Sequence, residues 1–147
     1  MSSVINSLKE AGRLISSVLL DTSLISKIDD SINLISEKFQ SNHKIVICGN
    51  GGSACDAMHF AEEFTGRFNK NRRALPVISL TDPGHLTCVS NDFGFEFVFQ
   101  RGVEAFGQKG DVFIGLSTSG NSENIKLALD EAINKDMKSI LFLGKSG

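Results

Sequence analysis

With 147 residues, 41% of them hydrophobic and 22% charged, the chain has the composition of one globular domain rather than of a disordered segment. Fifteen Lys and Arg against seventeen Asp and Glu leave a net charge of −2, which argues against non-specific binding to nucleic acid or to an acidic membrane surface. Three cysteines without a CxxC pair predict reduced thiols and a cytoplasmic protein, and no apolar run has the length of a membrane span.

Two amphipathic helices are predicted within residues 1–40. Apolar residues recur every three or four positions in the first, at Val4, Leu8, Ala11, Ile15 and Val18. The second follows a break at residues 21–23, any of which fits the N-cap, and its apolar residues are Leu24, Ile28, Ile32, Ile35 and Phe39. Two apolar faces exceed what one sheet face needs, so part of this surface is predicted to be a subunit interface. The alternative is that both helices cover the sheet.

From residue 44 onward, short apolar runs of strand length alternate with helical segments. The runs cover residues 45–48, 77–80, 112–116 and 139–143, and the helical segments cover residues 53–65, 95–106 and 122–135. This alternation predicts an α/β fold with a doubly wound parallel sheet over residues 44–147, preceded by the two helices within a single domain of residues 1–147. The sequence stops four residues after the fourth run, so a closing strand and helix are expected to be missing.

The first candidate site is the glycine loop, residues 49–54, between the first predicted strand and the next helix. Asn50, Gly51 and Gly52 lie where a strand end meets a helix N-terminus, a place that exposes backbone N–H groups to anions and polar ligands. The loop formally fits the dinucleotide pattern G-x-G-x-x-G/A, but the first acidic candidate, Asp82, comes 33 residues after Gly49 instead of about 20. The interpretation of the chain as a nicotinamide-dependent oxidoreductase therefore rests on this weak pattern alone.

One helical turn separates His59 from Glu63, so both side chains lie on the same face of the predicted helix. An imidazole and a carboxylate at this spacing can share a metal ion or act together as acid and base. The alternative is an ordinary i,i+4 pair on a helix surface, and the spacing alone slightly favours that alternative.

The second candidate site is the serine loop, residues 117–122, between the third predicted strand and its helix. It supplies the hydroxyls of Ser117, Thr118, Ser119 and Ser122, a glycine for the turn and the first N–H groups of a helix. Because the loop has no Lys or Arg, it suits a single phosphate monoester better than a triphosphate. The alternative is that these residues only cap the helix and shape the turn, but four hydroxyls in six residues favour phosphate.

Three other polar stretches have less specific patterns. Asn91 and Asp92 are suited to hydrogen bonds with sugar hydroxyls, but Asx residues before a glycine are also ordinary turn formers, and the spacing alone favours that interpretation. His85 is interpreted as a turn residue. The basic residues between positions 67 and 73 are interpreted as a solvated turn rather than as a polyanion site.

Three motifs in order carry a family resemblance: GNGGSACDAMHFAEEFTGRF, SNDFGFEFVF and GDVFIGLSTSGNSENI. Together they resemble the sugar-isomerase (SIS) domain family, and in particular its isomerases of seven-carbon sugar phosphates. The likeness covers residues 44–147. It implies a flavodoxin-like sheet and an aldose–ketose isomerase that converts sedoheptulose 7-phosphate to glycero-manno-heptose 7-phosphate through an enediol, for bacterial heptose and lipopolysaccharide synthesis.

The resemblance also implies roles for individual residues and for partners. The substrate would contact Asn50, Gly51, Gly52, Asn91 and Asp92, and the phosphate would be held by Ser117, Thr118, Ser119 and Ser122. His59 and Glu63 would bind zinc, one ion per subunit, with Glu63 also acting as the catalytic base. A homotetramer with active sites at its subunit interfaces is expected, with no nucleic-acid or membrane partner.

One feature of the family pattern lies beyond this sequence. The family has a glutamine and a second histidine in a helix after the fourth strand, so only two zinc ligands are expected within this sequence. Either the sequence is a fragment, or a tail has been omitted, or this form is inactive alone. The alternative to an enzyme is a non-catalytic SIS-domain protein that binds a sugar phosphate or associates with a replication initiator. The uncharged Ser119 and the stretches at residues 65–68 and 93–95 match the isomerases better.

Overall fold

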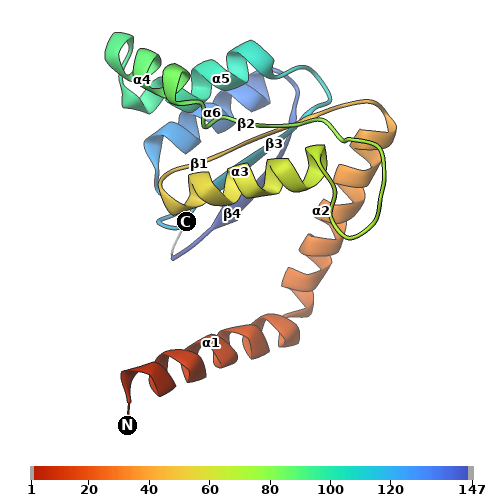
Figure 1. The fold of residues 1–147 in the computed structure, drawn as a ribbon, viewed down its shortest axis with the longest axis vertical. Helices are drawn as coiled ribbons and strands as arrows, with labels where there is room; N and C mark the ends of the chain where they lie inside the picture. The colour runs from red at the N-terminus through yellow and green to blue at the C-terminus, as the bar shows by residue number, and fades with distance from the viewer. Residues whose placement is uncertain (1, 146–147) are drawn as a thin grey trace. The chain divides into compact units, whose positions relative to one another are not determined.

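The computed structural model describes residues 2–145, and the chain divides into two compact units, Met1–Glu37 and Lys38–Gly147. The first unit contains α1 (Ser3–Leu20) and most of α2 (Thr22–Gln40), as Figure 1 shows in red and orange. Both predicted helices are therefore present. Asp21 supplies the N-cap of α2, because its Oδ1 accepts a hydrogen bond from the Leu24 N–H at 2.9 Å.

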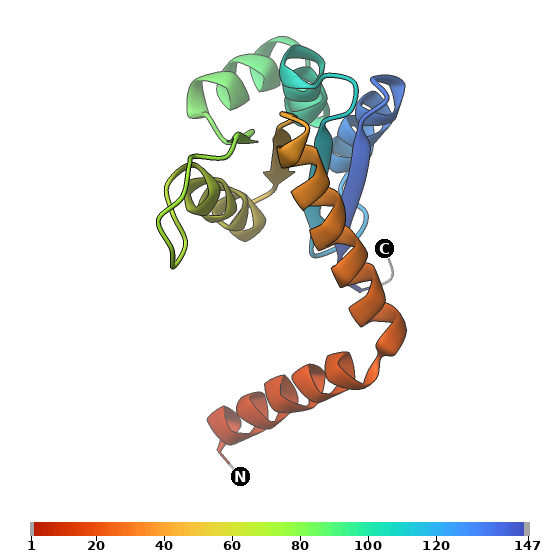
Figure 2. The same cartoon turned by 90° about the vertical axis from the view of Figure 1, so that its right-hand side faces the viewer.

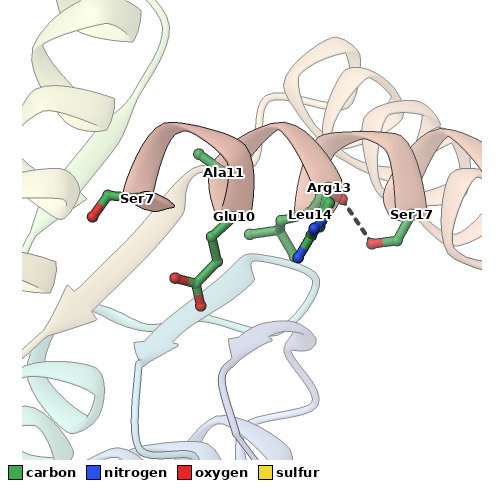
Figure 3. A pocket seen from close by; sticks show the side chains of 6 residues that line it. All are labelled: Ser7, Glu10, Ala11, Arg13, Leu14 and Ser17. Atoms are coloured by element: carbon green, nitrogen blue, oxygen red, sulfur yellow. Dashed lines mark hydrogen bonds between the residues drawn. The ribbon is translucent and has the colours of Figure 1, made fainter. Parts of the chain in front are cut away.

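Most apolar residues of α1 are exposed. None of its residues is buried, and Val4, Leu8 and Ile15 retain 62–69% of their accessible surface. Figure 3 shows six α1 side chains that border a shallow hollow: Ser7, Glu10, Ala11, Arg13, Leu14 and Ser17. All six come from one helix, so this hollow cannot surround a ligand.

The second unit is built on a four-stranded sheet whose neighbouring strands all pair in parallel. The strands are β1 (Ile45–Gly49), β2 (Val77–Ser79), β3 (Val112–Ser117) and β4 (Lys138–Leu143), in the order β2-β1-β3-β4. This order confirms the predicted doubly wound, flavodoxin-like sheet. The two central strands are buried along nearly their whole length, as expected for a sheet covered on both faces.

Helices pack on both faces of this sheet. They are α3 (Gly52–Thr65), α4 (Pro83–Asp92), α5 (Val98–Phe106) and α6 (Glu123–Asn134), with a short 3₁₀ turn, η1 (Phe95–Phe97), before α5. One buried hydrophobic cluster joins α4, α5 and α6 to the strand residues Val46, Cys48 and Phe113. Because side chains alternate along a strand, Ile45 and Ile47 point to the other face of the sheet, which α3 covers. Figures 1 and 2 show α3 and these three helices on different sides of the sheet.

One helix was missed, since the sequence around His85 was interpreted as a turn. His85 instead lies in the first turn of α4, and its ring Nε2 is 2.8 Å from the Val98 carbonyl oxygen. The signals of a helix start were present: Asp82 is the N-cap and accepts from the His85 N–H at 2.7 Å, and Pro83 occupies the first helical position. Asn91 and Asp92, favoured as turn formers on spacing alone, are the last two residues of this helix.

Among residues 2–145, no helix is both long enough and apolar enough to cross a membrane.

Candidate active site

The topology brings the glycine loop and the serine loop to adjacent strand ends. From β1 the chain crosses outward to β2, and from β3 it crosses in the opposite direction to β4. Since such crossovers are right-handed, α3 and α6 leave neighbouring strands on opposite faces, which creates a crevice between β1 and β3. Gly49 pairs in register with Leu116, so the two loops begin level with one another.

Glycine is required at two positions of the first loop. At Gly49, a Cβ would lie 2.6 Å from the Ser53 carbonyl oxygen, because the first turn of α3 folds closely over the strand end. Gly51 has a φ of 56°, in the left-handed region that disfavours other residues. These glycines let α3 start directly above β1, with its first N–H groups at the crevice.

In the serine loop, three hydroxyls form a compact cluster. The Ser117 Oγ lies 3.1 Å from the Ser122 Oγ, and the Ser119 Oγ lies 3.4 Å from each of them. Ser122 occupies the N-cap position of α6, yet its side chain makes no capping hydrogen bond. Helix capping therefore does not account for Ser122, and its hydroxyl is directed toward the other two serines.

A hollow of about 420 Å³ joins the two loops. Its lining residues are Ser53, Asp56, Leu116, Ser117, Thr118, Phe142, Leu143 and Gly144. The start of α3 and the end of β3 thus border the same space. A phosphate held by the serine loop would lie beside the exposed side of α3.

A second hollow continues along α3. It is lined by Asp56, His59, Phe60, Glu63, Phe64 and Phe68, so Asp56 borders both hollows. The His59 Nε2 is 3.2 Å from the Glu63 Oε1; the imidazole is mostly exposed and the carboxylate is about one-third exposed. The predicted base and the predicted phosphate loop are consequently reached from one side of α3.

His59 and Glu63 by themselves do not fit a complete zinc site. Zinc sites in proteins use at least three protein ligands, and within residues 2–145 no three His, Cys, Asp or Glu side chains come together as a possible metal site. The pair supplies one nitrogen and one oxygen donor of suitable type.

Asn91 and Asp92 are not brought to either hollow. The Asn91 Nδ2 donates to the Asp92 Oδ1 at 2.8 Å, and the Cys88 thiol is 3.6 Å from the Asp92 Oδ2. Within the described part of the chain, their side-chain hydrogen bonds stay on α4. Their predicted contact with substrate remains a prediction.

Arg72 corrects the interpretation of residues 67–73 as a solvated turn. Its half-buried guanidinium donates to the carbonyl oxygens of Glu63 at 2.6 Å, Phe64 at 2.8 Å and Arg73 at 2.9 Å. Carbonyl groups at a helix C-terminus lack intrahelical partners, so this side chain caps the end of α3 that carries Glu63. No local sequence signal identifies this role, because Arg72 lies beyond the helix in an irregular loop.

The cysteines near the glycine loop differ in environment. Cys48, at the end of β1, is fully buried, and burial raises the pKa of its thiol well above the usual range. It therefore stays a neutral thiol near pH 7 and is no candidate nucleophile. Cys55, in the first turn of α3, is exposed.

Comparison with known proteins identifies the family. Residues 8–144 match the SIS domain family. The phosphoheptose isomerase of Sodalis glossinidius is 53% identical over 142 residues, which cover 97% of this chain and 73% of that protein. The phosphoheptose isomerase of Cytophaga hutchinsonii is 48% identical over 146 residues, which cover 99% of this chain and 76% of that protein.

Solved structures agree. Phosphoheptose isomerase GmhA from Neisseria gonorrhoeae superposes with a TM-score of 0.89 at 38% identity, covering 98% of this chain and 74% of that chain. A phosphoheptose isomerase from Francisella tularensis gives the same TM-score at 34% identity, with 100% and 78% covered. The chain belongs to the SIS domain family and, within it, to the phosphoheptose isomerases.

Proposed function

We propose that this chain isomerises sedoheptulose 7-phosphate to glycero-manno-heptose 7-phosphate, through an enediol, in bacterial heptose synthesis. The observation that carries this proposal is the pair of adjoining hollows along α3. One hollow meets the serine loop, the other contains Glu63, and Asp56 borders both. A phosphorylated sugar chain can thus be anchored at one end and processed at the other, and orientation of this kind supplies much of the catalysis.

The serine loop would bind the phosphate. Three clustered hydroxyls and the N-terminus of α6 provide hydrogen-bond donors and a positive dipole end without a fixed cation in the loop. Lys126, one turn into α6, borders a narrow hollow with Ser117 and Ser122 and adds a cation nearby. This arrangement suits a phosphate monoester.

Glu63 would carry the proton between the two carbons. Its carboxylate removes a proton from C1 of the ketose, the C1–H electron pair forms the C1–C2 double bond, and the carbonyl oxygen at C2 gains a proton. The same carboxylic acid returns its proton to C2 as the oxygen on C1 loses a proton and becomes the aldehyde. Moving a proton from the C1 oxygen to the C2 oxygen needs a second acid–base group. His59 is a candidate for it, because its Nε2 lies 3.2 Å from the Glu63 Oε1.

The two other readings have less support. The relatives named phosphoheptose isomerase do not favour a non-catalytic binding protein, and the second strand supplies no acidic residue at the spacing that a dinucleotide site requires.

Thermal unfolding tests the substrate class. Sedoheptulose 7-phosphate at about 100 times its Kd should raise the Tm by about 5–10 °C, whereas NAD should have no effect. Ser122→Ala should weaken sugar-phosphate binding by about 10- to 100-fold, because it removes one hydrogen bond to a charged group. Ser31→Ala is the matched control, since that hydroxyl donates to the Lys27 carbonyl oxygen on α2. Stabilisation by NAD, or none by the sugar phosphate, would contradict the proposal.

Zinc and a homotetramer belong to the same proposal. His59 and Glu63 would supply two of the zinc ligands, which do not complete a zinc site by themselves, and the exposed apolar residues of α1 would be covered by other copies of the chain. Bound zinc would supply a Lewis acid near the sugar's oxygens. Native mass spectrometry should give four subunits with one zinc each, and His59→Ala should lose the metal but keep the subunit number. A monomer would contradict the proposed homotetramer, and a tetramer without metal would contradict the proposed zinc site.

A role in lipopolysaccharide synthesis and a cytoplasmic location complete the proposal. The three cysteines are all free, which is typical of a reducing compartment. Cell fractionation with an antibody to the protein checks the location.

A further inference from the structure

A reciprocal pair of amides links the glycine loop to the first turn of α6, which directly follows the serine loop. The Asn50 Nδ2 donates to the Asn124 Oδ1 at 2.9 Å, and the Asn124 Nδ2 donates back to the Asn50 Oδ1 at 2.9 Å. The two residues are 74 positions apart in the sequence. Asn124 is only 4% exposed, and each of the two amides supplies one donor and one acceptor to this pair.

The pair spans the crevice at the point where the sheet changes its winding direction. Asn50 directly follows β1 in the glycine loop, and Asn124 lies in the first turn of α6, two residues after Ser122. Since α3 and α6 depart on opposite faces, the crossover helices themselves do not tie the two loops together. These two hydrogen bonds are a direct side-chain link between them.

Asn124 borders neither of the two hollows that contain the candidate phosphate and proton-transfer groups. It therefore acts on the site through Asn50 rather than by touching the sugar phosphate. A buried amide that loses its partner pays the full cost of desolvation, so the loops are held at the separation that keeps both bonds.

We propose that Asn124 is a positioning residue which, through Asn50, sets the distance between the glycine loop and the serine loop. One sugar phosphate can then contact both loops at once. This inference rests on the proposed function, because it concerns how the same substrate is held at its two ends. Inorganic phosphate, which reaches only the serine loop, does not depend on the pair.

The test is a double-mutant cycle read with two ligands. Asn50→Ala, Asn124→Ala and the double variant are compared with the unaltered protein by calorimetric titration with sedoheptulose 7-phosphate and with inorganic phosphate. Asn134→Ala, at the exposed far end of α6, is the matched control. Asn124→Ala leaves the partly exposed Asn50 able to bond water, whereas Asn50→Ala leaves the buried Asn124 amide without its partner, so circular dichroism verifies that each variant is folded.

Asn124→Ala is expected to weaken sugar-phosphate binding by roughly tenfold, which is what two neutral hydrogen bonds are worth, and to leave phosphate binding unchanged. The double variant should bind the sugar phosphate no more weakly than Asn50→Ala alone, because each substitution breaks the same link. Additive losses, equal losses for both ligands, or no loss in Asn124→Ala would overturn the inference. If the unaltered protein bound both ligands equally well, the proposed function would fail before any variant was compared, and the inference with it.

Discussion

Glu63→Gln is expected to lower kcat for sedoheptulose 7-phosphate by about 10²- to 10⁴-fold, the usual contribution of a general base. The amide has the shape of the carboxylate but cannot take up the proton from carbon. Binding of inorganic phosphate should change little, because Glu63 lies in the hollow beyond Asp56 and not in the serine loop. Initial rates and a phosphate titration measure the two effects separately.

The neighbouring Glu62→Gln is the matched control. Glu62 is exposed and does not line the hollow that contains His59 and Glu63, so its neutralisation should leave kcat within about twofold, as expected for an exposed substitution. If Glu63→Gln retained more than about a tenth of the activity, the general-base contribution would be smaller than expected and another group would have to move the proton.

Asp111→Ala is expected to lower the free energy of unfolding by about 3–5 kcal/mol, because several partly buried donors lose their acceptor at about 1–3 kcal/mol each. Asp111 is 2% exposed and lies immediately before β3, at the end of the strands opposite the site. Its carboxylate accepts from the Lys44 N–H at 3.0 Å, the Lys44 Nζ at 2.6 Å and the Gln108 N–H at 2.9 Å. Removing it leaves two backbone donors and an ammonium group without their acceptor.

Urea denaturation measures this loss. Asp130→Ala, on the exposed side of α6, should change the free energy of unfolding by no more than about 0.5 kcal/mol. Asp111→Asn keeps one oxygen acceptor, so its loss of unfolding free energy should lie between those of Asp111→Ala and Asp130→Ala. A loss below about 1 kcal/mol in Asp111→Ala would show that water replaces the carboxylate at this edge.

Local chemistry made much of the fold predictable. The helices follow from an apolar periodicity of 3.6 and the strands from short apolar runs between them, and each segment carries its signal by itself. The glycine and serine loops were recognisable because tight turns and anion sites at helix N-termini need particular residues within a few positions. The i,i+4 spacing likewise placed His59 and Glu63 on one face of α3, where the structure has them 3.2 Å apart.

The errors in the predicted helices occurred where two short sequence signals, one for a helix start and one for a turn, lie side by side. Asp82 and Pro83 start α4, but the glycine that follows suggested a turn. The predicted helix at residues 95–106 begins as a 3₁₀ turn and becomes α-helical only at Val98, because Gly94, with a φ of 111°, sets the direction of entry.

The sequence by itself determined most of the elements and their order, the glycine and serine loops and the candidate acid–base pair, because each depends on residues close together in the chain. Only the tertiary structure decided that β1 lies between β2 and β3, that Asn124 bonds to Asn50, and that Arg72 caps the end of α3. It also left Asn91 and Asp92 on α4, away from both hollows. These features depend on contacts between segments distant in sequence, whose partners are chosen by packing and crossover handedness rather than by any local pattern.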